Sequence, residues 1–199
     1  MKHLIEVEFC ALESQKTFDL LLRKLKKEGR LKRKSKRLSV MFFDTIKGVD
    51  YDIRVRTKGD GAEIVVKKGG YSSHRRIEFG QDILRGQVVG MVKLLSLFGF
   101  QCKIGERENT IFVLPGGSEA TLVKARSMFY IEIERLSLPK NISKARKEVL
   151  DWFEYFGLEP IRSEKVFLCL CKKLSKVADW NFYGREKDFK KLERILKKY

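Results

Sequence analysis

The sequence has few of the residues that mark several large classes of protein. Only 3 of its 199 residues are proline, which excludes a collagen-like chain and argues against low-complexity disorder. Its cysteines are too sparse for a disulfide scaffold and lack the spacing of a structural zinc site. We therefore expect reduced thiols in a cytoplasmic protein, at Cys10, Cys102, Cys169 and Cys171.

Long apolar runs and linker-like segments are also missing. No apolar run approaches the roughly 20 residues that a membrane-spanning helix needs, so the sequence predicts no association with a membrane. The chain opens on Met1-Lys2-His3 and then a strand-like run, which does not resemble a signal peptide. Without a Gly/Ser-rich or Pro-rich linker or an internal repeat, residues 1–199 are expected to form a single domain.

Positive charge is the strongest compositional feature. Lysine and arginine total 43 against 26 acidic residues, a formal net charge of +17. Such an excess favours an anionic partner, such as a nucleic acid, polyphosphate or a phosphorylated metabolite, although basic proteins without one are also common. The densest run, residues 30–37, is interpreted as a solvated loop or as a basic collar that attracts RNA or polyphosphate.

Many short segments alternate between apolar and polar residues, which is the pattern of β-strands. Gly59-Asp60-Gly61 predicts a hairpin turn between two of them, because Asp-Gly adopts positive φ at low cost. Strands are expected over residues 3–10, 38–45, 51–58, 62–68, 74–79, 101–107, 109–114, 119–125 and 129–136.

Helical periodicity appears in a smaller number of segments. Residues 164–171 fit either a short apolar strand or a helix. Strands joined by hairpins, with a few helices between them, predict an α+β fold built on an antiparallel sheet or barrel. Helices are expected over residues 14–28, 82–98 with Asp82 as N-cap, 143–156, and about 185–199 at the C-terminus.

The predicted strands carry an apolar face and a face with charges of both signs. Residues i and i+2 point to the same side, roughly 6.5–7 Å apart, so Glu6 and Glu8 share a face, as do Arg54 and Arg56. One interpretation is a sheet with its charged face in water. The other is a closed barrel with charged faces inside, and it is favoured because the amphipathic helices need apolar strand faces to cover.

Charges gathered inside a barrel would need ligands of opposite sign. Clustered carboxylates repel one another and take up protons unless they share a cation, and oxygen ligands of this kind suit Mg²⁺ or Mn²⁺. Clustered arginines suit phosphate, which the guanidinium binds with two parallel hydrogen bonds.

The order of these motifs resembles the CYTH, or triphosphate tunnel metalloenzyme, superfamily over most of the chain. The N-terminal strand resembles its Glu-X-Glu-X-Lys signature and residues 42–45 its Tyr-Phe-Asp-Thr element. The further matches are Ile53-Arg-Val-Arg56, Val66-Lys-Lys-Gly69, Arg76-Ile-Glu78, Phe98-Gly-Phe100 and Ile131-Glu-Ile-Glu134.

The resemblance implies an eight-stranded antiparallel barrel that encloses a polar tunnel, with helices packed on its outside. It implies metal ligands at Glu6, Glu8, Glu78, Glu132 and Glu134, of which Glu132 and Glu134 would also act in catalysis by positioning the attacking water. It implies phosphate-binding residues at Arg54, Arg56, Lys67 and Arg76, with Arg107 and Lys165 as weaker candidates.

The same resemblance implies a triphosphatase that uses Mg²⁺ or Mn²⁺ on inorganic triphosphate, thiamine triphosphate or a nucleoside triphosphate. Two departures affect this expectation: Cys10 replaces the signature lysine, and residues 121–125 lack the usual aspartate. The alternatives are therefore a catalytically degenerate module that binds polyphosphate, nucleotide or an RNA 5′-triphosphate, a basic protein with general RNA affinity, and, less favoured, an adenylate cyclase.

Overall fold

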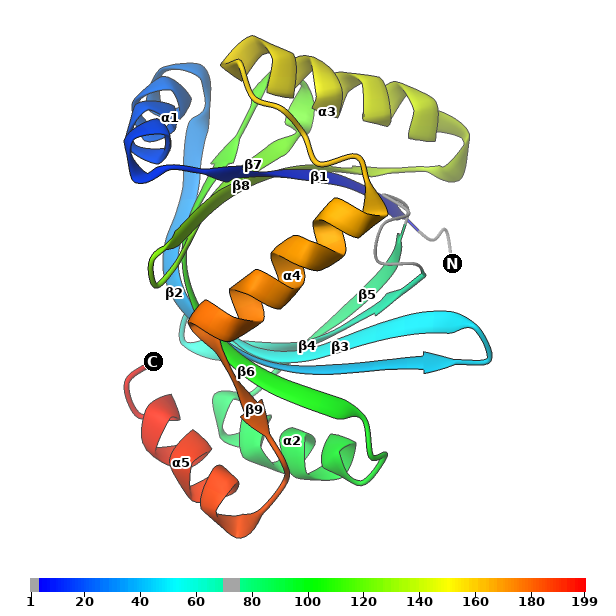
Figure 1. Cartoon of the computed structure of the whole chain (residues 1–199), viewed down its shortest axis with the longest axis vertical. Helices are drawn as coiled ribbons and strands as arrows, with labels where there is room; N and C mark the ends of the chain where they lie inside the picture. Colours follow the sequence, from blue (N-terminus) through cyan, green and yellow to red (C-terminus); the bar gives the residue numbers. More distant parts are fainter. Residues whose placement is uncertain (1–3, 70–75) are drawn as a thin grey trace.

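Eight strands close into an antiparallel barrel in the computed structural model, which describes residues 4–69 and 76–199 (Figure 1). The strand order is β2-β3-β4-β5-β1-β8-β7-β6, and β6 pairs back with β2. The predicted fold class is thereby confirmed. The strands are β1 (Ile5–Glu13), β2 (Arg30–Ile46), β3 (Val49–Lys58), β4 (Gly61–Lys68), β5 (Arg76–Ile83), β6 (Gln101–Val113), β7 (Glu119–Ala125) and β8 (Met128–Ser137).

Two separate apolar layers cover the outside of the barrel. α1 (Gln15–Glu28) and α3 (Ile142–Phe156) bury the outward side chains of β1, such as Phe9, against α-helical residues such as Phe153. α2 (Val88–Ser96) and α5 (Glu186–Leu196) do the same for β2, where Phe42 is fully buried. Burial of this apolar surface is the main favourable term that holds the helices on the wall.

The apolar layers fix the direction of the charged faces. Because Val7 and Phe9 point outward into the helical layer, Glu6 and Glu8 point into the bore. The same alternation applies to β8, where Ile131 lies in the outer layer. The prediction of a barrel with charges inside and apolar side chains outside is confirmed.

α4 (Glu164–Ala178) differs from the other helices, because it lies across one opening of the barrel (Figure 1). Its residues Leu170 and Leu174 pack on Val123 and Tyr130, inward-facing residues of β7 and β8. The segment that we expected to be a short strand or helix is therefore a helix that covers the bore.

β9 (Asp179–Phe182) was not predicted. It pairs with β6 from Cys102 to Gly105. β7 pairs with the same edge of β6 further along, beyond this segment. Four residues at the end of a helix carry too weak an alternation to be recognised as a strand.

Three other predictions of local structure are wrong. The basic run 30–37 is not a loop, because β2 runs unbroken from Arg30 and pairs with β6. Asp82 does not cap a helix; β5 continues to Ile83, and a 3₁₀ turn at Arg85–Gln87 precedes α2. The two strands expected over 101–107 and 109–114 are one long strand, β6, which ends at Val113. The predicted start of the fifth strand, residues 74 and 75, lies outside the described residues.

The other helices agree with the sequence patterns. α1 begins after Ser14, whose hydroxyl accepts a hydrogen bond from the amide of Thr17, and ends at Gly29. α3 ends at Gly157, which has the left-handed conformation that glycine adopts most easily. Within the described ranges, no helix combines the length and the apolar character needed to cross a membrane.

Candidate functional site

Three carboxylates from two neighbouring strands meet inside the barrel. Glu6 and Glu8 of β1 and Glu134 of β8 each offer an oxygen, and these oxygens lie within 4.8 Å of one another. The register brings them together, since Glu8 pairs directly with Glu134. A group of carboxylate oxygens at this spacing is the donor set that Mg²⁺ or Mn²⁺ prefers.

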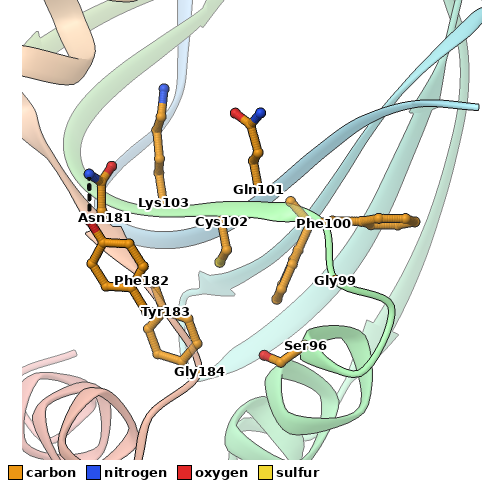
Figure 2. Close-up of a pocket in the computed structure, with 11 residues that line it drawn as sticks. Ser96, Gly99, Phe100, Gln101, Cys102, Lys103, Asn181, Phe182, Tyr183 and Gly184 are labelled. Atoms are coloured by element: carbon orange, nitrogen blue, oxygen red, sulfur yellow. Dashed lines mark hydrogen bonds between the residues drawn. The ribbon is translucent and has the colours of Figure 1, made fainter.

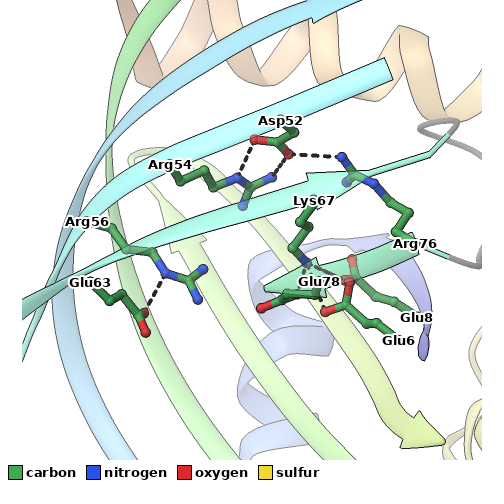
Figure 3. Close-up of polar contacts among 9 residues, drawn as sticks. All are labelled: Glu6, Glu8, Asp52, Arg54, Arg56, Glu63, Lys67, Arg76 and Glu78. Atoms are coloured by element: carbon green, nitrogen blue, oxygen red, sulfur yellow. Dashed lines mark hydrogen bonds and ion pairs between the residues drawn. The ribbon is translucent and has the colours of Figure 1, made fainter. Parts of the chain in front are cut away.

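The ammonium group of Lys67, on β4, lies among these carboxylates (Figure 3). Its Nζ is 2.7 Å from Glu6, 3.5 Å from Glu8 and 3.1 Å from Glu78. The side chain of Lys67 is only 8% exposed. Lys67 was predicted to bind phosphate, but here it forms ion pairs with three predicted metal ligands.

One lysine does not neutralise the cluster. Burial and then the neighbouring Glu8 raise the pKa of Glu6 well above its usual value. The same two causes raise the pKa of Glu134 to about 7 and also raise that of Glu132. Because carboxylates with raised pKa values are stabilised by a further cation, the residues present fit a divalent metal ion.

A second group centres on Asp52 of β3, which is 1% exposed (Figure 3). Its carboxylate accepts hydrogen bonds from Nε and Nη2 of Arg54, at 2.9 and 2.7 Å. Arg76 of β5 donates to the same carboxylate at 3.4 Å. Burial would raise the pKa of Asp52, but Arg54 and Arg76 hold it below its usual value. Two predicted phosphate-binding arginines are therefore already engaged with an internal anion.

The remaining predicted arginines are paired as well. Nε of Arg56 donates to Glu63 at 2.6 Å. Nη2 of Arg107 donates at 2.6 Å to Asp179 of β9, and both side chains are almost fully buried. The ion pair of Arg107 explains why β9 returns to β6, because a buried guanidinium requires a partner charge.

Gly105 provides the space for this ion pair. A Cβ atom at Gly105 would overlap the Asp179 carboxylate and lie 2.7 Å from Nη1 of Arg107. We expect Gly105→Ala to displace the pair and to lower the free energy of unfolding by about 1–3 kcal/mol, as measured by denaturant unfolding.

Gly80→Ala on β5 is the matched control, since a Cβ there would meet only ordinary contacts, the nearest at 3.7 Å from Val65. If Gly105→Ala and Gly80→Ala are equally stable, the proposed role of Gly105 in making room for the Arg107–Asp179 pair is wrong.

α4 adds further groups to the bore. Nζ of Lys103, on β6, donates to Oγ of Ser175 on α4 at 2.9 Å. Burial raises the pKa of the Cys171 thiol, while Arg54, the next contribution, lowers it. Cys171 lies one helical turn before Ser175 on α4, so the two side chains share the side of the helix that contacts Lys103. Cys10, at the lysine position of the signature that the sequence resembles, is buried and its thiol pKa is raised, so it supplies no charge.

The structure gathers most of the predicted site residues around one bore but excludes one. Lys165 is exposed at the start of α4, not in a strand. The residues on the inner wall are Glu6, Glu8, Arg54, Arg56, Lys67, Arg76, Glu78, Arg107, Glu132 and Glu134. Sequence reasoning assigned no role to the acidic partners Asp52, Glu63 and Asp179, although the first two share strand faces with predicted residues.

A pocket of about 390 Å³ lies elsewhere, where β6 begins between the end of α2 and β9 (Figure 2). Phe100, Cys102 and Tyr183 are among the residues that line it. The described residues around it include none of the predicted site residues, so it is separate from the charged cluster.

Comparison with solved structures supports the same fold. The PH1819 protein of Pyrococcus horikoshii superposes with a TM-score of 0.62 at 20% identity over 84% of this chain and 99% of that chain. A candidate adenylate cyclase from Vibrio parahaemolyticus gives a TM-score of 0.60 at 17% identity over 83% and 98%.

HpAC1 from Hippeastrum, a candidate adenylyl cyclase described as having a dominant triphosphatase activity, gives a TM-score of 0.51 at 14% identity. That match covers 81% of this chain and 91% of HpAC1. No protein-family model and no curated protein sequence matches the chain. At these identities the likeness establishes the fold and leaves the chemistry to be argued from the site.

Proposed function

The chain has the tunnel fold of the CYTH, or triphosphate tunnel metalloenzyme, superfamily, and on that premise we propose that it is a metal-dependent phosphohydrolase. The substrate is inorganic triphosphate or an organic triphosphate, such as thiamine triphosphate or a nucleoside triphosphate. The cytoplasmic location belongs to this proposal, and it agrees with the four free cysteines.

The observation that carries the proposal is the meeting of a carboxylate cluster and an arginine cluster inside one barrel. Arg54 connects the two, because Asp52 of the second group and Glu8 of the carboxylate cluster both raise the pKa of its guanidinium. A triphosphate chelated to a divalent ion needs this combination of oxygen donors and guanidinium groups.

The carboxylates of Glu6, Glu8 and Glu134 would hold Mg²⁺ or Mn²⁺, with Glu78 and Glu132 close to them. A divalent ion bound there supplies charge neutralisation at the phosphate oxygens and lowers the pKa of a bound water. Such electrostatic alignment accounts for most of the catalysis in phosphoryl transfer.

The chain's own residues then bind and orient the substrate. Arg54, Arg56 and Arg76 hold phosphate oxygens, with Arg107 as a weaker candidate. Lys67 turns from its glutamates toward the phosphate. Glu132 and Glu134 orient a water, and the Glu132 carboxylate, which is outside the group of three proposed ligands, accepts its proton as the water oxygen attacks the terminal phosphorus. The bond to the bridging oxygen breaks, and the electron pair leaves with diphosphate from inorganic triphosphate, or with the organic diphosphate from an organic triphosphate.

Phosphate release tests this proposal. Purified protein is incubated with inorganic triphosphate, thiamine triphosphate or ATP, with and without Mn²⁺ or Mg²⁺. We expect release that requires the metal and is lost in Glu6→Ala/Glu8→Ala, because that variant removes two of the proposed ligands. If no substrate is hydrolysed faster by the wild type than by this variant, the enzyme proposal is wrong.

Cys10 favours a second candidate, a module that binds polyphosphate, a nucleotide or an RNA 5′-triphosphate without hydrolysing it. A buried neutral thiol replaces a lysine that could orient a phosphate. Thermal stabilisation by triphosphate without turnover would identify this case. Cyclisation of ATP would instead appear as cAMP, and general RNA affinity as salt-dependent binding that does not change when Arg54 is replaced.

A further inference from the structure

β2 brings an arginine into the bore that the sequence analysis did not assign. Arg37 and Ser39 share a strand face, and Leu38 between them points outward into the apolar layer under α2 and α5. Ser39 pairs with Arg56 on β3. Arg37 therefore lies one two-residue step beyond Arg56 along the wall of the tunnel.

Arg37 differs in its partners from Arg54 and Arg56, the two arginines nearest to it along the wall. Arg54 and Arg56 each donate Nε to a carboxylate. Nε of Arg37 is buried and has no hydrogen-bond partner among residues 4–69 and 76–199. The residue opposite it on β6 is Arg107, another cation. A buried donor without an acceptor is costly unless a ligand completes it.

The charges around Arg37 point to the same kind of ligand. Burial, then Arg56 and Arg54, lower the pKa of Arg37 to about 10, whereas Glu132 and Tyr130 across the bore oppose this. Three guanidinium groups that repel one another, one of them with a free donor, form a site that an anion would stabilise.

We propose that Arg37 is a specificity-determining residue that binds the phosphate group farthest from the metal ligands. This inference rests on the proposed function, since it takes the substrate to be a chain of phosphates anchored at the carboxylate cluster. It goes beyond that function in stating which residue distinguishes a triphosphate from a shorter chain.

The position of Arg37 along the tunnel wall supports a role in distinguishing phosphate chains of different length. Asp52 pairs with Lys67, which lies in the carboxylate cluster, and Arg54 and Arg56 follow Asp52 at two-residue steps. Each step is roughly 6.5–7 Å, and Arg37 comes one step later. Because one phosphate is shorter than one such step, the long Arg37 side chain has to reach back along the bore, toward Glu132, on which its charge acts. A triphosphate held at the carboxylates then comes closer to Arg37 than a diphosphate does.

Calorimetric titration with inorganic triphosphate and with pyrophosphate tests this inference. Mg²⁺ is kept in excess so that the phosphate chain is anchored at the carboxylates, and methylene-bridged forms of both ligands, which cannot be hydrolysed, keep the ligand intact. We expect Arg37→Gln to weaken triphosphate binding by about 10-fold to 100-fold, because it removes a charged hydrogen bond. The same variant should weaken pyrophosphate binding by less than about 2-fold. Arg37→Lys, which keeps the charge but not the planar fork, should fall between wild type and Arg37→Gln.

Lys36→Gln is the matched control, because Lys36 is the next residue on β2, points outward and is 74% exposed. It removes the same charge and should leave both affinities unchanged. Without ligand, Arg37→Gln should melt no lower than wild type, because it removes a repelled cation; a structural role would lower the melting temperature.

The outcomes separate this inference from the proposed function. If Arg37→Gln loses the same affinity for both ligands, or none for triphosphate, the proposed role of Arg37 is wrong even if the wild type hydrolyses triphosphate. A selective loss in a protein that never releases phosphate supports Arg37 and rejects the hydrolase. Failure of the wild type to bind triphosphate overturns both.

Discussion

Lys67→Met is expected to lower the free energy of unfolding by about 3–5 kcal/mol in metal-free buffer, because it leaves buried carboxylates without their counter-ion. The ammonium group of Lys67 is 2.7 Å from Glu6 and also pairs with Glu8 and Glu78. Mn²⁺ or Mg²⁺ should restore most of this stability, since a divalent ion would take the position of the missing charge. The variant should therefore gain more stability from metal than the wild type does.

Thermal unfolding in EDTA and in increasing concentrations of Mn²⁺ measures both effects. Lys68→Met is the matched control: Lys68 is the next residue on β4 and is exposed above the ring of Tyr51. It should lose little stability and show no altered response to metal. If Lys67→Met is destabilised but metal stabilises it no more than the wild type, Lys67 does not occupy the position of a metal ion.

The charged interior of the barrel could be predicted because two independent patterns agree. Glu6 and Glu8 alternate with Val7 and Phe9, and the amphipathic helices need apolar wall to cover. Both patterns are local, so the sequence alone carries them. The same alternation placed Arg54 and Arg56 on the inner face of β3.

Pairing between distant residues could not be predicted in the same way. Asp179 meets Arg107 only because β9 joins the free edge of β6, and 72 residues separate the two. The path of α4 across the opening likewise depends on inward apolar residues of β7 and β8 that resemble ordinary core positions. Long-range partners of this kind leave no periodic trace in the sequence.

The basic segment 30–37 shows how a strong compositional signal can conceal a strand. Lys32, Lys34 and Lys36 lie on the exposed face of β2, while Arg33 and Arg37 lie on the inner face. Because both faces are charged here, the alternation of apolar and polar residues that marks a strand disappears. Residues 38–45, which follow directly, do alternate clearly. The absence of any turn residue between them and the basic segment could have predicted that the strand begins before Leu38.

Asp52→Asn is the counterpart of Lys67→Met at the other charge group of the tunnel. The carboxylate of Asp52 holds Arg54 by two hydrogen bonds and Arg76 by a third, while being 1% exposed. Removing its charge leaves two enclosed guanidinium groups facing a neutral amide. We expect a loss of about 3–5 kcal/mol in the free energy of unfolding in buffer without multivalent anions.

Inorganic triphosphate should stabilise Asp52→Asn more than it stabilises the wild type, because Asp52 and a phosphate group compete for the same arginine donors. A ligand present at 100 times its dissociation constant contributes about 2.7 kcal/mol, so tighter binding by the variant would appear directly as a larger shift in unfolding temperature. Asp82→Asn, which removes a carboxylate from an exposed pair with Lys58, serves as the control and should change stability by less than about 1 kcal/mol. Equal stabilisation of Asp52→Asn and wild type by triphosphate would mean that Asp52 only orients Arg54 and leaves its phosphate-binding edge free. A larger gain would mean that the ligand-free tunnel neutralises itself at both ends, with Lys67 in the place of the metal and Asp52 in the place of a phosphate group.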